Sequence, residues 1–219
     1  MLNFRFEKTK NAVFISHIDI LRSLNRSLRR TGIKVRYSQG YNPHMLVNLT
    51  QPLVTGIKSL CEWASIDTDF DNEKEFIKLY NKACPEGLSA LECIITAEKP
   101  KIAANVTASD YFIECEEAIK FREDLERVAF EDFIIEIERK GQTIKKDVRN
   151  LIHQVKVDER GIFARLSFGN LNLRIDKFAE VLNKRYGLQI RHRDITRQTQ
   201  LIKQNNKYIT VSQYLKGLR

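Results

Sequence analysis

The sequence has few of the residues that build disulfide frameworks, metal centres or iron–sulfur clusters. Its four cysteines show neither CxxC spacing nor the CxxxCxxC triplet of an iron–sulfur radical enzyme; they are Cys61, Cys84, Cys93 and Cys115. Scattered cysteines of this kind are usually reduced and packed as small apolar residues. We therefore expect no disulfide, no metal and no cofactor, while a reactive thiol or a metal site assembled in space stays open.

Long apolar runs and phosphate-binding glycine motifs are also absent from the sequence. No run approaches the ~20 apolar residues that cross a bilayer. Arg5, Glu7 and Lys8 leave no apolar core for a signal peptide at the N-terminus. We therefore expect no membrane partner and a cytoplasmic location. Neither GxxxxGK[ST] nor GxGxxG occurs, which excludes the usual nucleotide-phosphate loops.

Acidic residues are scarce at both ends of the chain and concentrated in its middle. The net charge is +9, and residues 1–60 hold ten Lys or Arg but two acids. Residues 61–139 hold nine basic and twenty acidic residues, whereas residues 140–219 hold eighteen and six. If the two basic ends share one face, they would attract a polyanion, and the acidic middle would meet solvent or a basic partner. Solvated surfaces without a ligand are the alternative.

Hydrophobic periodicity and turn residues predict an α+β protein of two tandem ferredoxin-like (βαββαβ) halves with antiparallel sheets. The predicted strands are 2–7, 12–15, 45–53, 60–69, 88–97, 110–116, 133–139, 152–158, 162–168 and 188–195. The predicted helices are 16–31, 73–83, 117–130 and 177–186. The segment Glu98-Lys99-Pro100-Lys101 interrupts this pattern. We therefore predict an N-terminal domain over 1–98 and a C-terminal domain over 99–219.

The first predicted helix carries a row of arginines opposite its apolar residues. Ser16 suits the N-cap and Gly32 the C′ position. Ile18, Leu21, Leu24 and Leu28 define the expected buried face, which leaves the arginines on the other side: Arg22, Arg26, Arg29 and Arg30. Arginine can contact phosphate through two hydrogen bonds. This row predicts a nucleic-acid or other anionic partner, with a plain solvated helix face as the alternative.

The segment Tyr37-Ser38-Gln39-Gly40-Tyr41-Asn42-Pro43-His44 predicts a loop that combines rings with polar side chains. Tyr37 and Tyr41 would stack on bases, while Gln39, Asn42 and His44 would contact base edges or backbone. Tyrosines packed against the sheet are the alternative.

Two further features are candidates for the same surface. His17, at the start of the first helix, is favoured in its neutral form by the helix dipole, which suits a general base, although a structural histidine is the commoner case. Near the C-terminus, Arg191, Arg193 and Arg197 recur in a strand-like segment and would form a second basic patch beside Lys184 and Arg185.

One dense motif set resembles a known family. Phe14-Ile15-Ser16-His17-Ile18-Asp19, Arg29-Arg30-Thr31-Gly32 and the loop 37–44 are similar to the F-I-S-H-L-D-L, R-R-A-G and Y-S-Q-G-F-N-P-H motifs of the uncharacterised "radical SAM-linked" family. The resemblance covers about residues 5–70; Thr31 and Met45 depart from the family pattern. It implies an accessory protein that partners a radical S-adenosylmethionine protein, whose cluster would belong to that partner.

These observations together predict an RNA-binding accessory protein, more consistent with a binding role than with an enzyme. One alternative is a metal-independent endoribonuclease of the kind that processes CRISPR repeats. Such enzymes have tandem ferredoxin-like folds similar to the one predicted here, and His17 would serve as the catalytic base. No glycine-rich loop of those enzymes is found near the C-terminus. A second alternative is a protein–protein adaptor that does not bind RNA.

Overall fold

The computed structural model describes residues 1–139, 141–169 and 171–219, and it shows an α+β protein, as predicted. The strands are β1 (Leu2–Lys8), β2 (Val47–Leu49), β3 (Lys58–Ile66), β4 (Ala90–Ile95), β5 (Val106–Glu114), β6 (Ile134–Arg139), β7 (Gln142–Asp147), β8 (Ile152–Asp158), β9 (Gly161–Ser167), β10 (Ile195–Gln204) and β11 (Lys207–Thr210). The α-helices are α1 (His17–Thr31), α2 (Glu73–Ala83), α3 (Ile102–Asn105), α4 (Arg122–Arg127), α5 (Ile175–Tyr186) and α6 (Val211–Lys216). Short 3-10 helices are η1 (Lys10–Phe14), η2 (Glu116–Phe121), η3 (Arg149–Leu151) and η4 (His192–Asp194).

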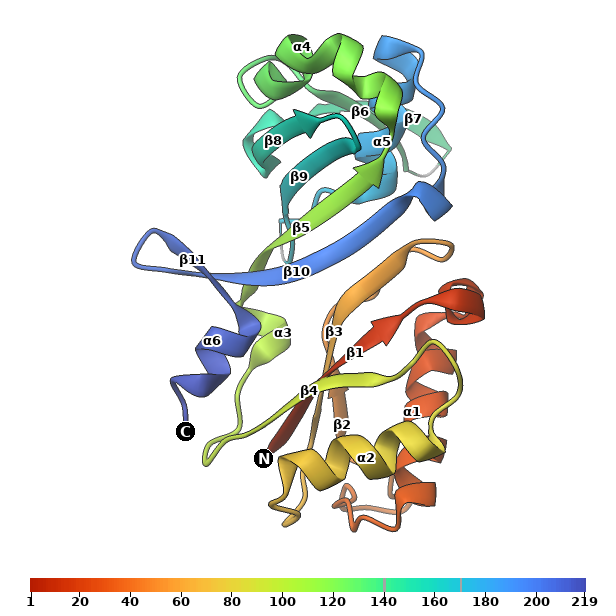
Figure 1. Cartoon of the computed structure of the whole chain (residues 1–219), viewed down its shortest axis with the longest axis vertical. Helices are drawn as coiled ribbons and strands as arrows, with labels where there is room; N and C mark the ends of the chain where they lie inside the picture. Colours follow the sequence, from red (N-terminus) through yellow and green to blue (C-terminus); the bar gives the residue numbers. More distant parts are fainter. Residues whose placement is uncertain (140, 170) are drawn as a thin grey trace.

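The prediction of two tandem ferredoxin-like halves with antiparallel sheets is wrong. Nine strands form one mixed sheet in the order β4-β1-β3-β10-β5-β9-β8, with β2 on β3 and β11 on β10 (Figure 1). The strands β3 and β10 join its two parts in parallel, through the pairs Thr196–Lys58 and Arg197–Ser59. β6 and β7 form a separate two-stranded sheet. Local periodicity cannot reveal a pairing between strands that are so far apart in the chain. The domain division at 98/99 stays a prediction.

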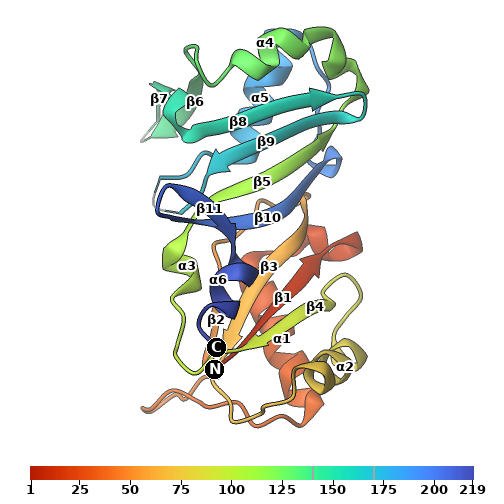
Figure 2. The ribbon, with the colours of Figure 1, turned by 60° about the vertical axis from the view of Figure 1, so that its left-hand side comes forward.

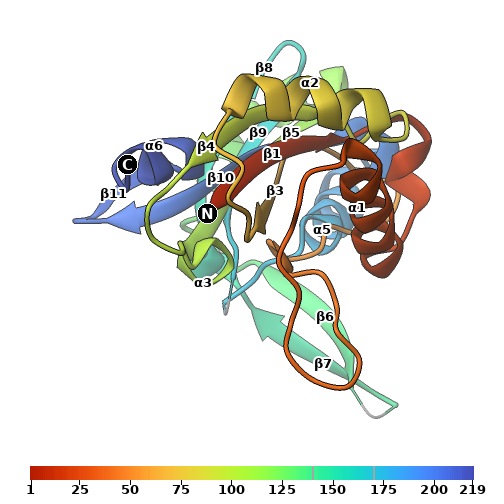
Figure 3. The ribbon, with the colours of Figure 1, turned by 90° about the horizontal axis from the view of Figure 1, so that it is seen from below.

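The helices cover the sheet through three apolar clusters. α1 and α2 pack on β1 and β3 around Phe4, Phe76 and Tyr80, and both helices are visible from below in Figure 3. α4 and α5 pack on β5, β8 and β9 around Phe133 and Phe178. A third cluster lies where the two parts meet, and it includes residues of α3, β10 and α6. The molecule is therefore elongated, with α4 at one end and α2 at the other (Figure 1).

Three further element predictions need correction. The segment 12–15 belongs mostly to the 3-10 helix η1 and not to a strand. The predicted strand 45–53 shortens to the three residues of β2, and the predicted helix 117–130 divides into η2 and α4. By contrast, α2 has the bounds predicted for it, because Asn72 caps its start and Phe76 and Tyr80 face the core. Tertiary contacts thus determine the type and the bounds of the short elements, whereas strong local signals determine the bounds of α2.

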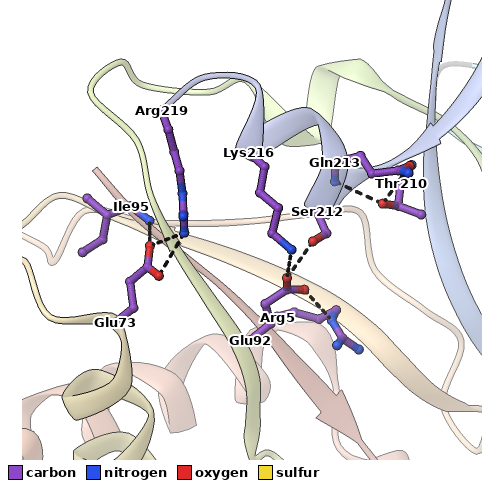
Figure 4. Close-up of polar contacts among 9 residues, drawn as sticks. All are labelled: Arg5, Glu73, Glu92, Ile95, Thr210, Ser212, Gln213, Lys216 and Arg219. Carbon is purple, nitrogen blue, oxygen red and sulfur yellow. Dashed lines mark hydrogen bonds and ion pairs between the residues drawn. The ribbon is translucent and has the colours of Figure 1, made fainter.

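The C-terminal helix α6 returns to the N-terminal part of the sheet, so the two chain ends lie near each other (Figures 1 and 2). Figure 4 shows the polar contacts that hold it. Arg219 donates two hydrogen bonds to the Glu73 carboxylate, at 2.7 and 2.9 Å. Lys216 lies 3.1 Å from Glu92, and Ser212 donates a hydrogen bond of 2.6 Å to the same carboxylate. The C-terminal segment is therefore attached to β4 through Glu92 and to α2 through Glu73.

The four cysteines are free thiols. Burial raises the pKa of Cys61 and of Cys93 to about 12, so both remain protonated at neutral pH. Among the described residues, no helix has both the length and the apolar character that crossing a membrane requires.

Candidate nucleic-acid interface

The arginines of α1 lie on its solvent-facing side. The helix begins after Ser16, whose hydroxyl accepts a hydrogen bond of 3.2 Å from the Asp19 amide, and it ends at Gly32, where φ is +75°. Its buried residues include Leu24 and Leu28, as predicted, together with Ile20. The expected core residue Ile18 is instead 62% exposed. The helix is therefore rotated slightly from the predicted orientation, and it still presents a basic outer face.

These four arginines differ in their partners. Arg22 lies 3.1 Å from Asp19, an exposed ion pair one helical turn away. No salt bridge involves the other three within the described residues; they are Arg26, Arg29 and Arg30. All four side chains are exposed. Their guanidinium groups are therefore free to contact phosphate without first breaking a strong pair.

The loop predicted to carry exposed rings begins shortly after α1. Tyr37 and Met45 form an isolated β-bridge that closes it, and Tyr41 at its tip is fully exposed. Gly40 adopts φ +122°, a backbone angle that favours glycine. Gln39 and Asn42 are exposed as well. In Figure 3 this orange segment projects away from the sheet. The alternative that both tyrosines pack against the sheet does not hold for Tyr41.

His44 is fixed at the base of the loop by Ser38. The Ser38 hydroxyl accepts a hydrogen bond of 3.0 Å from the His44 amide and lies 2.8 Å from Nδ1 of the same residue. If the hydroxyl donates to Nδ1, the imidazole is neutral and its Nε2 carries the proton. The exposed Nε2–H would then be available as a hydrogen-bond donor to a ligand.

The helix α1 separates His17 from this loop. His17 is the first of fifteen helical residues, so the axis between the two ends is about 20 Å long. Arg29 and Arg30, in the last turn, are next to the loop in the chain, whereas His17 belongs to the other end. The arginine row thus runs along α1 toward the end of the helix that the loop follows. His17 and His44, by contrast, lie at opposite ends of α1.

His17 is half-buried beside a cluster of buried charges. Burial lowers the pKa of its imidazole, Glu62 opposes that shift, and the positive charges of Lys8 and Arg197 lower the pKa further. Lys8 and Arg197 are both buried, and Glu62 is 7% exposed. The neutral form favoured at His17 agrees with the expectation from the helix dipole, although burial is its main cause.

We expect the pKa of His17 to lie below the ordinary value of 6.5, measurable by following its ring protons with NMR during a pH titration. Because the folded pKa is lower than the unfolded one, the contribution of His17 to stability is present above pH 6.5 and is lost as the pH falls through the folded pKa. The variant His17→Gln should therefore lose less stability than the wild type as the pH falls below the pKa that histidine has in the unfolded chain. A pKa at or above the ordinary value would contradict this assignment.

The C-terminal arginines do not form the predicted patch. The segment 188–195 is not a strand: the 3-10 helix η4 covers His192–Asp194, and β10 begins at Ile195. Arg191 and Arg193 are exposed, and each guanidinium lies 3.8 Å from the Asp194 carboxylate. Arg197 is completely buried and pairs with Glu62, so it cannot contact a phosphate on the surface.

A short chain of contacts connects η4 with the start of α1. Nδ1 of His192 lies 3.1 Å from the carbonyl oxygen of Thr55, and the Gly56 amide donates a hydrogen bond of 2.7 Å to the Val13 carbonyl. A Cβ atom at Gly56 would lie 3.2 Å from that of His192. Arg191 and Arg193 are therefore near η1, at the end of α1 that is remote from the loop.

Sequence reasoning missed Lys8 and Glu62, which have no local signature. Arg197, however, follows the buried Ile195 by two positions in a strand, which places both residues on the same face. This spacing of two residues is a sequence signal that Arg197 lies on the buried face of the strand.

The fold and surface define an α+β protein with a basic helix and an exposed aromatic loop. A family model described as "Uncharacterized protein conserved in bacteria (DUF2344)" matches residues 2–206, so the chain belongs to that family. No curated protein matches the sequence. The predicted membership of an uncharacterised family is thus confirmed at this level, while the link to radical S-adenosylmethionine proteins stays a prediction.

Proposed function

We propose that this protein binds RNA through the outer face of α1 and the loop 37–45. The observation that supports this most directly is the arginine row, three of whose members have no ion-pair partner among the described residues. Phosphates would contact the guanidinium groups, and an unpaired base would stack on Tyr41. Gln39, Asn42 and His44 are placed to donate or accept hydrogen bonds at the same end.

The salt dependence of RNA binding tests this proposal. For the double variant Arg22→Ala/Arg26→Ala, we expect the slope of log K against log salt to become shallower by about 0.7 for each single-strand phosphate that the variant no longer neutralises. Affinity at low salt should fall by about tenfold, because charge-assisted hydrogen bonds to phosphate are removed. Fluorescence anisotropy with a labelled RNA that contains a single-stranded loop would measure both quantities.

A matched control is available on α4. Arg122 and Arg127 are exposed helical arginines; Arg122 pairs with Glu126, and the helix also carries Glu123 and Asp124. Arg122→Ala/Arg127→Ala removes the same total charge, and we expect little change in the slope. Equal effects of the two double variants, or no RNA binding by the wild type at physiological salt, would contradict the proposal; the second result favours the protein–protein adaptor.

We further propose that the protein serves as an accessory to a radical S-adenosylmethionine enzyme, to which it presents the RNA. The motif resemblance of residues 5–70 supports this role. Acidic side chains of η2 and of α4 would form the docking surface, and α4 lies at the end of the molecule remote from α1; they are Glu116, Glu117, Glu123 and Asp124. Co-purification with a radical S-adenosylmethionine protein of the same cell, weakened by charge reversal at these residues, is the expected result.

A metal-independent endoribonuclease is the second candidate, and the lowered pKa of His17 favours it. A neutral, partly accessible imidazole is able to accept the proton of a 2′-hydroxyl. The buried Arg197 is not able to stabilise the developing charge, so an exposed cation such as Arg193 would have to do so. Specific cleavage of structured RNA in EDTA, abolished by His17→Ala, would establish this activity over simple binding.

A further inference from the structure

Within the described residues, one face of the C-terminal part of the sheet is left without a helix. The apolar residues of β9 that face α4 and α5 are Ile162, Ala164 and Leu166. The residues between them, Phe163 and Arg165, point to the opposite side and are half-buried. Figure 2 shows β8, β9 and β5 with α5 behind them and no helix in front.

Two phenylalanines lie next to each other on this face. Phe112 of β5 and Phe163 of β9 are register partners in antiparallel strands, and both are half-buried. Side chains of directly opposite residues are neighbours, with Cβ atoms about 5 Å apart. The guanidinium of Arg160 lies 5.6 Å from the centre of the Phe112 ring, and Lys156 is the partner of Phe163 on β8. The aromatic pair therefore has a cation on either side.

A third ring, Tyr208 of β11, lies further along the same face. The guanidinium of Arg165 is 5.1 Å from the centre of this ring, and the Lys203 ammonium is 5.9 Å from it. Asp110 accepts two hydrogen bonds from Arg165, at 2.7 and 3.0 Å, and thereby fixes the guanidinium against Tyr208. Arg165 follows Phe163 by two positions, which corresponds to about 7 Å along a strand.

The part of this face around Phe163 and Tyr208 is basic and suits an anionic ligand, because Lys156 is the register partner of Phe163 and Lys203 lies beside Tyr208. Burial lowers the pKa of His153, and the positive charges of Lys203 and Arg165 lower it further. Asp110 pairs with Arg165, and Asp158 pairs with Arg160 at 3.2 Å. At the Phe112 end, Glu114, Glu116 and Asp194 also lie beside Arg160. Lys156 and Lys203 are exposed and have no salt bridge among the residues that the structure describes.

We propose that this face binds single-stranded RNA, and we define it as the open sheet face: Phe112, Lys156, Arg160, Phe163, Arg165 and Tyr208. Unpaired bases stack on the phenylalanines, and the lysine and arginine side chains contact the phosphates that flank them. A duplex is not a ligand for this face, because its bases are already stacked. The inference relies on the proposed function only for the ligand class, since α1 and the loop 37–45 are not part of this face.

The experiment uses the full chain and a labelled single-stranded oligouridine. The double variant Phe112→Leu/Phe163→Leu keeps most of the apolar volume but removes the aromatic rings. Stacking is strong enough that we expect an affinity weaker by about tenfold or more. The salt slope should stay at the wild-type value, because the basic side chains that contact phosphate are unchanged. The control Phe130→Leu, an 83%-exposed phenylalanine beyond α4, should bind as the wild type does.

The outcomes separate this inference from the proposed function. If the phenylalanine variant binds oligouridine as tightly as the wild type while Arg22→Ala/Arg26→Ala binds more weakly, the open sheet face is not an RNA site and the proposed function holds. The reverse result supports this face and rejects the α1 surface. The stacking model would be overturned if Phe112→Leu/Phe163→Leu weakened the binding of a matched duplex RNA as much as that of oligouridine. Displacement of the oligouridine by an acidic peptide at equal concentration would overturn it as well.

Discussion

Replacing Glu62 with alanine is expected to lower the free energy of unfolding by about 3–5 kcal/mol, the usual effect of leaving a buried charge without its partner. Glu62 accepts a hydrogen bond from the fully buried Arg197. Burial on its own would lower the pKa of Arg197, yet the charge of Glu62 contributes to a net rise. Without this carboxylate, the two buried cations Lys8 and Arg197 would lose the one carboxylate that offsets them among the described residues.

The pH dependence of this variant follows from Lys8. Burial lowers the pKa of Lys8, Glu62 opposes the shift, and Arg197 adds to it. In Glu62→Ala the opposing charge is absent, so the folded pKa of Lys8 falls further below 10.5. Because the unfolded chain then binds more protons than the folded one, the stability of the variant rises as the pH increases toward the unfolded pKa. Chemical denaturation at several pH values would measure this recovery.

The exposed ion pair of Lys10 with Glu86 provides a control. Its two side chains are 61% and 71% exposed. Glu86→Ala should therefore change the free energy of unfolding far less than Glu62→Ala does, because solvent screens the exposed pair. A second variant, Lys8→Met in the Glu62→Ala background, should restore part of the lost stability by removing one of the two buried cations. Equal effects of Glu62→Ala and Glu86→Ala would show that the buried cluster has no special role.

The fold shows which features local sequence determines. The bounds of α2, the Ser16 cap and the Gly32 end of α1 follow from signals within a few residues. The pairing of β3 with β10 has no such signal, because it connects Ser59 with Arg197 across most of the chain. Local sequence patterns therefore predict most helices and strands, but they do not predict that the strands join into a single sheet.

The candidate sites show the same division. The arginine face of α1 could be predicted because helical spacing alone decides which residues share a side. The open sheet face was missed because Phe112 and Phe163 become neighbours only through the pairing of β5 with β9. Both phenylalanines occur in apolar segments, which carry no local sign that one side of the sheet lacks a helix.

Removal of residues 207–219 is expected to uncover Trp63, the only tryptophan of the chain. This ring is 2% exposed and belongs to the cluster that Val211 and Leu215 of α6 complete. Burying each of these two aliphatic side chains contributes about 1.5–3 kcal/mol, so the truncated chain should lose about 3–6 kcal/mol of stability. The family match ends at residue 206, before α6.

Tryptophan fluorescence measures the exposure directly. The truncated chain should show emission at longer wavelength and stronger quenching by acrylamide than the wild type. Leu215→Ala is a milder test, with an expected loss of about 2–5 kcal/mol and a smaller fluorescence change, and it is informative if the truncated chain does not fold. Lys216→Ala removes only the partly exposed ion pair with Glu92 and should cost less than about 1 kcal/mol. Unchanged quenching in both the truncated chain and Leu215→Ala would mean that α6 does not cover Trp63 in solution.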